Sequence, residues 1–277
     1  SVTKQDTGFE VKVDLVAAQQ VNSKCESDAT ESHETTTQRV YKTKRVIVAT
    51  GPFHTPFVPA FSNKLSDSVI QLHSSQYRNP EQLQEGASLV VGAGDSGFQI
   101  LKEIAESRPE QQVYFSGKTD LMTLPQEFLG KTLWWWFDKL GVLSVNKFSW
   151  IGKKLQHKMQ PVIGINIKEL LAQKNITPVG HSLDGDGETV TCKRQTLHEI
   201  KNIVWATGYR PEFSWLKGID LDEAGYPVNY RGVSSTEGMY FIGLPWMYTR
   251  GSATLGGVYK DADHLIEAMF QLQRQSL

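Results

Sequence analysis

Apolar and polar positions near the N-terminus alternate with a period of two, which is typical of half-exposed strands. The alternation covers residues 9–21 and returns in residues 38–48, so we predict a strand in each segment. Residues 22–38 are rich in Ser, Thr, Glu and Asp and are predicted to form an exposed loop. Residues 52–80 contain several prolines and show neither period, which predicts an irregular connection.

The period changes in residues 88–116. Residues 88–91 form a short apolar run that predicts a buried strand, residues 96–107 carry apolar side chains on one helical face, and residues 112–116 predict the next strand. A strand, a helix and a strand within about 30 residues make a β-α-β unit. This order of elements predicts an α/β fold with a Rossmann-like domain.

The rest of the chain continues with mixed elements. Residues 120–160 are rich in aromatic side chains and are predicted to be mainly helical, with the run Trp134–Trp136 packed in a core or an interface. The further predicted elements are a helix over 166–174, two strand-like runs around a turn over 187–204, a short strand over 239–243 and an amphipathic helix over 256–274.

Composition narrows the class of protein without naming a function. A length of 277 residues fits two domains, and 39% hydrophobic residues suffice for an ordinary core. The formal net charge of −1 offers no electrostatic case for nucleic acid or an anionic membrane as a partner, and a homodimer is left open. Cys25 and Cys192 form neither a CxxC pair nor a metal-ligand cluster, which fits a reducing cytoplasm and predicts no metal site.

The strongest local motif is a glycine loop directly after the strand at 88–91 and directly before the helix at 96–107. Its residues are Gly92, Ala93, Gly94, Asp95, Ser96 and Gly97, in the GxGxxG pattern of dinucleotide sites. In that pattern the first glycine permits a tight turn, the second lets the backbone approach a pyrophosphate, and the third lets helix and strand pack closely. The motif favours a dinucleotide site, and a tight turn that binds nothing is the alternative.

The end of the following strand discriminates between the two dinucleotides. An NAD site places Asp or Glu there to hold the ribose 2′-hydroxyl. This chain instead has Ser116 and Lys118, a hydroxyl and a cation that suit a 2′-phosphate. We therefore predict NADP over NAD, with an ordinary solvated lysine at Lys118 as the alternative.

Two further patterns carry a family resemblance. An Ala-Thr-Gly turn follows a strand twice, at Ala49, Thr50 and Gly51 and again at 206–208, on either side of the glycine loop. The segment 71–78 has an HSxxYR pattern that includes His73 and Tyr77, and the second turn continues through Thr207, Gly208, Tyr209 and Arg210 to a proline. With the GAGDSG loop, these stretches resemble the flavin-containing monooxygenases, a family with two dinucleotide-binding domains.

The resemblance implies an architecture and two cofactors, FAD and NADP. An NADP-binding domain over 79–200 is expected to be inserted into an FAD-binding domain formed by 1–78 and 201–277. The residues named in the three motifs are expected to bind these cofactors. The family's first GxGxxG, which cradles FAD, has no counterpart in this sequence, so we expect an N-terminally truncated chain that is poorly soluble or flavin-free. The sequence also departs from the family fingerprint upstream of His73, where Asp67 and Val69 replace Phe and Gly.

The resemblance also implies a reaction. Hydride is expected to pass from NADPH to FAD, followed by activation of O2 and transfer of oxygen to a small nucleophilic or carbonyl substrate. The cofactors carry this chemistry, so no catalytic side chain is predicted. An NADPH-dependent flavoprotein reductase without oxygenation and a non-catalytic NADP-binding remnant are the alternatives.

Overall fold

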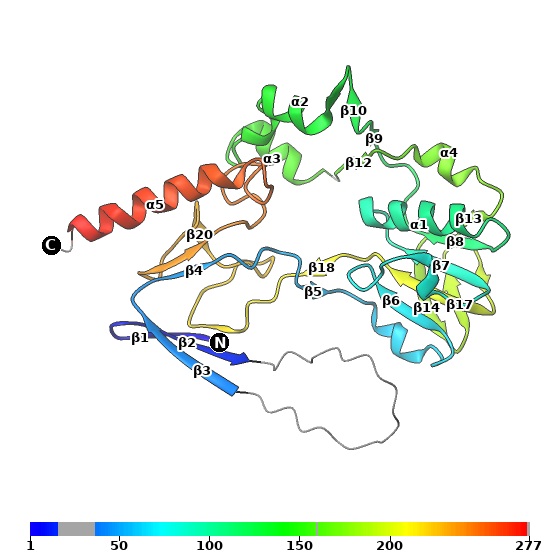
Figure 1. Cartoon of the computed structure of the whole chain (residues 1–277), viewed down its shortest axis with the longest axis horizontal. Coiled ribbons are helices and arrows are strands. Elements are labelled where there is room, and N and C mark those ends of the chain that lie inside the picture. Colours follow the sequence, from blue (N-terminus) through cyan, green and yellow to red (C-terminus); the bar gives the residue numbers. More distant parts are fainter. Residues whose placement is uncertain (16–36, 159, 276–277) are drawn as a thin grey trace, which may run out of the picture.

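A parallel sheet organises one part of the molecule. The computed structural model describes residues 1–15, 37–158 and 160–275 (Figure 1). Five strands lie in the order β13-β8-β7-β17-β6, and every neighbouring pair is parallel. They are β6 (Ile70–His73), β7 (Ala87–Val91), β8 (Val113–Ser116), β13 (Ile176–Pro178) and β17 (Ile200–Trp205).

Both faces of this sheet are covered, as the apolar run in β7 requires. On one face lies α1 (Asp95–Ser107), whose Phe98, Leu101 and Ile104 are fully buried against the sheet. On the other face lies an antiparallel sheet of β14 (Ser182–Asp186), β15 (Thr189–Cys192) and β16 (Thr196–Leu197), which closes a second core around Trp205. The predicted β-α-β unit is confirmed as β7, α1 and β8.

The second part contains two four-stranded sheets. One has the order β19-β1-β2-β3 and the other β20-β21-β22-β4, and a core around Phe9, Phe213 and Phe241 lies among their strands. The strands are β1 (Val2–Gln5), β2 (Gly8–Leu15), β3 (Thr37–Thr43), β4 (Val46–Val48), β19 (Leu216–Lys217), β20 (Asn229–Tyr230), β21 (Val233–Ser234) and β22 (Met239–Phe241), and the final helix is α5 (Val258–Gln275).

Two short strands lie side by side between the two parts of the molecule. β5 (Thr55–Pro56) follows the first Ala-Thr-Gly turn, β18 (Tyr209–Arg210) follows the second, and the two pair antiparallel (Figure 1). A second contact forms where residues 143–147 hydrogen-bond to residues 248–251, for example from the Lys147 amide to the Tyr248 carbonyl at 2.9 Å. The predicted domain boundaries at 78/79 and 200/201 stay predictions. The parallel pairing of β17 with β6 and β7 places β6 and β17 in the same sheet as β7 and β8.

The aromatic segment differs most from the sequence prediction. Residues 120–158 contain two short helices among small strands, and Trp134 and Trp135 are 49% and 39% exposed. Of the two predicted settings for these side chains, packing in a core of this chain is wrong, and packing in an interface stays a prediction. The small elements are β9 (Thr123–Leu124), β10 (Glu127–Phe128), β11 (Lys131–Thr132), α2 (Leu133–Lys139), η3 (Val142–Ser144), α3 (Trp150–Gln156), β12 (Val162–Ile163) and α4 (Ile167–Leu171).

Two smaller differences follow the local sequence. The connection over 52–80 contains not only η1 (Ala60–Lys64) and η2 (Pro80–Gln82) but also the sheet-edge strand β6, which is too short to show a clear period. The predicted strand over 38–48 divides into β3 and β4. Residues 16–21 of the first predicted strand, and the loop residues 22–36, lie outside the described residues. None of the helices that the structure describes is long and apolar enough to cross a membrane.

Candidate nucleotide-binding site

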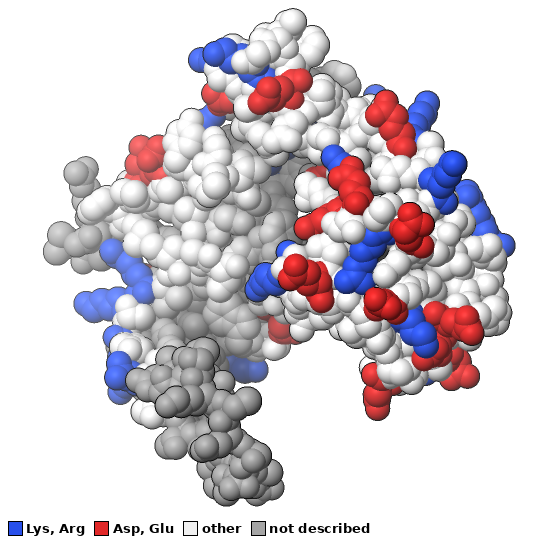
Figure 2. All heavy atoms as spheres, turned by 45° about the vertical axis from the view of Figure 1, so that its right-hand side comes forward, with Lys and Arg blue, Asp and Glu red and all other residues white. Residues whose placement is uncertain are grey.

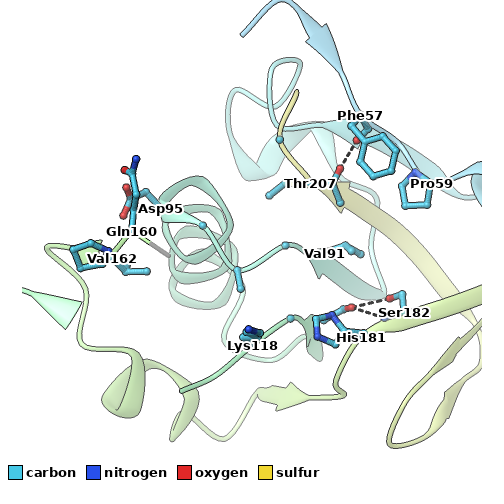
Figure 3. Close-up of a pocket in the computed structure, with 18 residues that line it drawn as sticks. Phe57, Pro59, Val91, Asp95, Lys118, Gln160, Val162, His181, Ser182 and Thr207 are labelled. Atoms are coloured by element: carbon cyan, nitrogen blue, oxygen red, sulfur yellow. Dashed lines mark hydrogen bonds between the residues drawn. The ribbon is translucent and has the colours of Figure 1, made fainter. Parts of the chain in front are cut away.

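A cavity of about 740 Å³ opens at the carboxyl ends of β7, β8 and β17. Ligands of open α/β sheets bind at this edge, just beyond the strand ends. Segments from six regions of the chain form the wall (Figure 3). The lining residues are Phe57, Pro59, Val91, Gly92, Ala93, Gly94, Asp95, Ser116, Gly117, Lys118, Gln160, Pro161, Val162, His181, Ser182, Ala206, Thr207 and Gly208.

The three glycines of the GxGxxG motif differ in why the structure needs a glycine at each position. Gly92 has φ +121°, and a Cβ there would lie 2.1 Å from the carbonyl oxygen of Ala206. A Cβ on Gly97 would lie 2.0 Å from the carbonyl oxygen of Gly92, so the third glycine is needed for α1 to approach the loop. A Cβ on Gly94 would meet no atom within 4 Å. The fold therefore requires Gly92 and Gly97, whereas Gly94 leaves open space at the cavity.

The N-terminus of α1 faces this space. Gly94 is its N-cap and supplies no side-chain hydrogen bond, so the first amides of the helix remain available to an anion. The carboxylate of Asp95 accepts a hydrogen bond from the Ile163 amide at 3.0 Å. This contact attaches the wall segment 160–162 to the start of the helix. Ser96 and Gly97 follow in the first turn and do not line the cavity.

The opposite side of the cavity is built around the end of β8. Ser116 is 2% exposed, and its Oγ accepts hydrogen bonds from the amide and the hydroxyl of Ser182, both at 2.8 Å. The Ser116 hydroxyl thus connects β8 to β14. Lys118 is exposed at the cavity, with His181 and Ser182 on the same side (Figure 3).

The second Ala-Thr-Gly turn closes a third side. The Thr207 hydroxyl donates a hydrogen bond to the Phe57 carbonyl, and the Phe57 amide donates to the Gly208 carbonyl at 2.9 Å. Gly208 takes φ +78°, a region that favours glycine. Tyr209 and Arg210 continue away into β18, where the Arg210 guanidinium lies 4.1 Å from the centre of the Phe57 ring.

His73 and Tyr77 do not reach the cavity. His73 is 3% exposed; its Nδ1 accepts from the Ser75 amide at 3.2 Å, and its Nε2 lies 3.0 Å from the Gly208 carbonyl oxygen, to which it donates. The imidazole therefore supports the second Ala-Thr-Gly turn from behind. Tyr77 is buried in the core beneath α1, where burial raises the pKa of its phenol well above the usual range.

The first Ala-Thr-Gly turn lies in the other part of the molecule. Ala49 and Thr50 are exposed directly after β4. Gly51 takes φ +66°, and a Cβ on it would meet no atom within 4 Å. None of the three lines the nucleotide cavity.

Sequence reasoning missed the walls that come from outside the β-α-β unit. His181 and Ser182 follow β13, and β13 pairs with β8, so the chain beyond both strands meets at one edge. A parallel strand predicted next to β8 would have indicated them. Gln160, Pro161 and Phe57 carry no comparable signal, because long connections bring them in. Among the described residues, no group of three or more His, Cys, Asp or Glu side chains is placed to hold a metal.

Known proteins match both the sequence and the fold. A family model described as pyridine nucleotide-disulphide oxidoreductase matches residues 2–123. The chain is 43% identical over 236 residues to the uncharacterized oxidoreductase CzcO of Bacillus subtilis, covering 84% of this chain and 67% of that protein. It is 42% identical over 233 residues to the CzcO-like oxidoreductase of Geobacillus kaustophilus, covering 84% and 66%.

The solved structure of the flavin-containing monooxygenase from Stenotrophomonas maltophilia shares the fold, with a TM-score of 0.60 at 21% identity over 86% of this chain and 65% of that one. The fold is thus that of flavoproteins with two dinucleotide-binding domains. The chain spans about two thirds of the length of the curated relatives named above. On this sequence identity, the chain belongs to the CzcO-like oxidoreductases.

Proposed function

We propose that this chain binds NADPH in the glycine-loop cavity, as part of an FAD- and NADPH-dependent monooxygenase-like oxidoreductase. Family membership implies FAD and NADP(H) as cofactors. The observation that carries the proposal is the open space at Gly94 in front of the free amides of α1, because a pyrophosphate needs both close backbone approach and N–H donors.

The choice of NADPH over NADH depends on the side of the cavity at the end of β8. Lys118 and His181 line it and are exposed, and no carboxylate of the described residues lines that side. We assign Lys118 to the 2′-phosphate, with the Ser182 segment held in place by Ser116. A lysine suits this role as a point charge that pairs with phosphate.

The described residues fit the two cofactors unequally. They form a cavity for NADP(H), whereas Ala49 and Thr50, which the family resemblance links to FAD, are exposed after β4 and line no part of it. The described part of the chain holds one glycine loop, and it belongs to the NADP(H) cavity.

When bound, NADPH supplies a hydride to the flavin. The residues of this chain bind and orient it. The α1 amides and Gly94 would hold the pyrophosphate, Lys118 the 2′-phosphate, and the 206–208 turn with Phe57 would close the far side. Monooxygenation of a small nucleophilic or carbonyl substrate, in the cytoplasm, completes the proposal.

The test is a coupling measurement. The purified chain is incubated with FAD, NADPH is added under air, and NADPH consumption, hydrogen peroxide and oxygenated products of small sulfides, amines and ketones are quantified. Where the chain retains FAD, the proposal predicts one oxygenated product per NADPH consumed in the presence of a substrate. Consumption of NADPH with no oxygenated product from any of the three classes would instead support a reductase.

Dithiol reduction is the less favoured reductase chemistry. The sequence has only Cys25 and Cys192, which are distant in sequence. Cys192 is buried, and burial raises the pKa of its thiol, so it is poorly suited to thiolate chemistry.

A further inference from the structure

A second cavity lies away from the nucleotide cavity and shares no lining residue with it. Its volume is about 480 Å³, within the range of small-molecule sites. It forms between α3, the turn before β20 and the loop after β22. Its wall is supplied by residues 147–148, by Lys153, Gln156 and His157 of the α3 region, by residues 226–229 and 244–247, and by Asp222.

Positive charge dominates the lining of this second cavity. Lys147 and Lys153 line it, with His157 at the end of α3. Neither lysine has an ion-pair partner within 4.0 Å among the described residues. Burial lowers the pKa of Lys147, and the carboxylates of Asp222 and Asp261 oppose this effect without outweighing it, so the ammonium has lost part of its hydration.

The one lining carboxylate is already occupied. Asp222 Oδ1 accepts hydrogen bonds from the amides of Ala224 at 3.0 Å and Tyr226 at 2.9 Å, which hold it in its own turn. Counting the two lysines and Asp222, the lining carries a formal charge of +1 when His157 is neutral. This net charge matches a monoanion.

The walls are aromatic and apolar. Phe148, Tyr226 and Trp246 line the cavity, and Leu244 and Met247 are buried at 2% exposure each. Trp246 adopts φ +52°, a left-handed conformation that is unfavourable for an L-residue and that concentrates at ligand sites. The surrounding loop therefore holds a large aromatic side chain at the cavity in an unfavourable backbone conformation.

Two amide side chains at this wall are used within the protein. Asn229 donates to the Pro227 carbonyl at 2.8 Å and accepts from the Gly232 amide at 2.9 Å, and Gln156 Nε2 donates to the Lys147 carbonyl at 2.9 Å. Specificity for a polar ligand group therefore falls to the lysines. We propose that this cavity binds a small aromatic monocarboxylate, with the ring against Trp246 and Tyr226 and the carboxylate at Lys147 and Lys153.

The test compares an acid with its neutral isostere. Binding of phenylacetate and phenylacetamide to the full chain is measured by calorimetry at fixed ionic strength, for the wild type and for Lys153→Gln. Lys154→Gln is the matched control, because Lys154 is the adjacent exposed residue of α3 and does not line the cavity. Removing one exposed charge should weaken phenylacetate binding by about fivefold in Lys153→Gln and leave phenylacetamide and the control unchanged.

Several results would overturn the site. They are equal binding of the acid and the amide, no saturable binding of phenylacetate, or equal effects of the Lys153 and Lys154 substitutions. Titrating phenylacetate in saturating NADPH separates this proposal from the proposed function. The two-cavity arrangement predicts an unchanged affinity for the acid, whereas displacement by NADPH would place the acid in the nucleotide cavity and contradict the proposal. Failure of NADPH to bind, with the acid still bound, would refute only the proposed function.

Discussion

Alanine at two glycines of one motif should have opposite consequences. Gly94 and Gly97 both belong to the GxGxxG loop, so a motif alone predicts the same loss of cofactor binding for Gly94→Ala and Gly97→Ala. The structure distinguishes them. Gly94 has φ −95° and ψ −178°, an extended conformation that alanine adopts, and its Cβ would meet no atom within 4 Å. The Gly97 Cβ would lie 2.0 Å from a carbonyl oxygen.

The magnitudes follow from these contacts. Gly94→Ala replaces one modest N-cap residue by a poorer one, which costs about 0.5 kcal/mol of folding free energy. Gly97→Ala requires α1 to move away from the loop, an overpacking change that costs about 1–3 kcal/mol. At about 2–4 °C per kcal/mol for a chain of this size, the Tm should fall by roughly 1–2 °C in the first variant and by roughly 2–12 °C in the second.

NADPH binding should not follow the order of stability of the two variants. The methyl group of Gly94→Ala occupies the space that a pyrophosphate must approach, so the Kd for NADPH should rise by at least about tenfold although the protein is folded. Thermal unfolding and NADPH titration of both variants and the wild type provide the assay. A Gly94→Ala protein that binds NADPH like the wild type would refute the assignment of this space to the pyrophosphate. A Gly97→Ala protein with an unchanged Tm would refute the packing argument.

Two further predictions concern charge and support around the site, and a third concerns an ion pair outside it. Asp95→Asn keeps an acceptor for the Ile163 amide and removes a negative charge near the pyrophosphate space, so NADPH affinity should rise about two- to fivefold at low salt, and titration at two ionic strengths checks it. His73→Ala removes the hydrogen bond to the Gly208 carbonyl and should lower the unfolding free energy by about 1–3 kcal/mol in denaturant titrations; an unchanged midpoint would contradict the supporting role. Hydrogen bonds from Lys201 and then Ser68 lower the pKa of Glu188, so its contribution is present above the unfolded pKa near 4.5 and is lost as the pH falls through the lower folded value. Glu188→Gln should therefore show a smaller acid-induced loss of stability than the wild type, with Glu110→Gln behaving like the wild type.

Much of the fold was predictable because its signals are local. The apolar run of β7, the amphipathic face of α1 and the glycines between them occupy contiguous residues, and the structure confirms all three. The short edge strand β6 was not predictable from its period, since four residues are too few to distinguish strand from coil. The exposed positions of Trp134 and Trp135 also escaped prediction, because large aromatic side chains usually signal a core.

The site was predictable only where a local sequence motif builds it. Gly92–Gly97, Lys118 and the second Ala-Thr-Gly turn surround the cavity or support it, and the sequence indicated each of them. The walls at 160–162 and 181–182 come from separate connections and have no local signature. Ser116 shows a further limit: the sequence predicts a hydroxyl at the right position, but its use by Ser182 depends on the packing of β14 against β8.

The distribution of charge was also not predictable from the sequence. The formal net charge of −1 describes the whole chain and conceals local differences. On the face shown in Figure 2, acidic and basic side chains are interspersed rather than gathered into one field. The lining of the second cavity nevertheless has more cations than carboxylates, which only the tertiary structure brings together.

The most direct test of the central claim is a calorimetric comparison of NADPH and NADH binding to the wild type and to Lys118→Ala at one fixed ionic strength. The assigned cavity predicts one NADPH per chain, a preference of about tenfold over NADH, and loss of most of that preference in Lys118→Ala, since a charge-assisted contact to the 2′-phosphate is worth about 1.5 kcal/mol. Equal or tighter binding of NADH, or no saturable binding of either dinucleotide, would contradict the account.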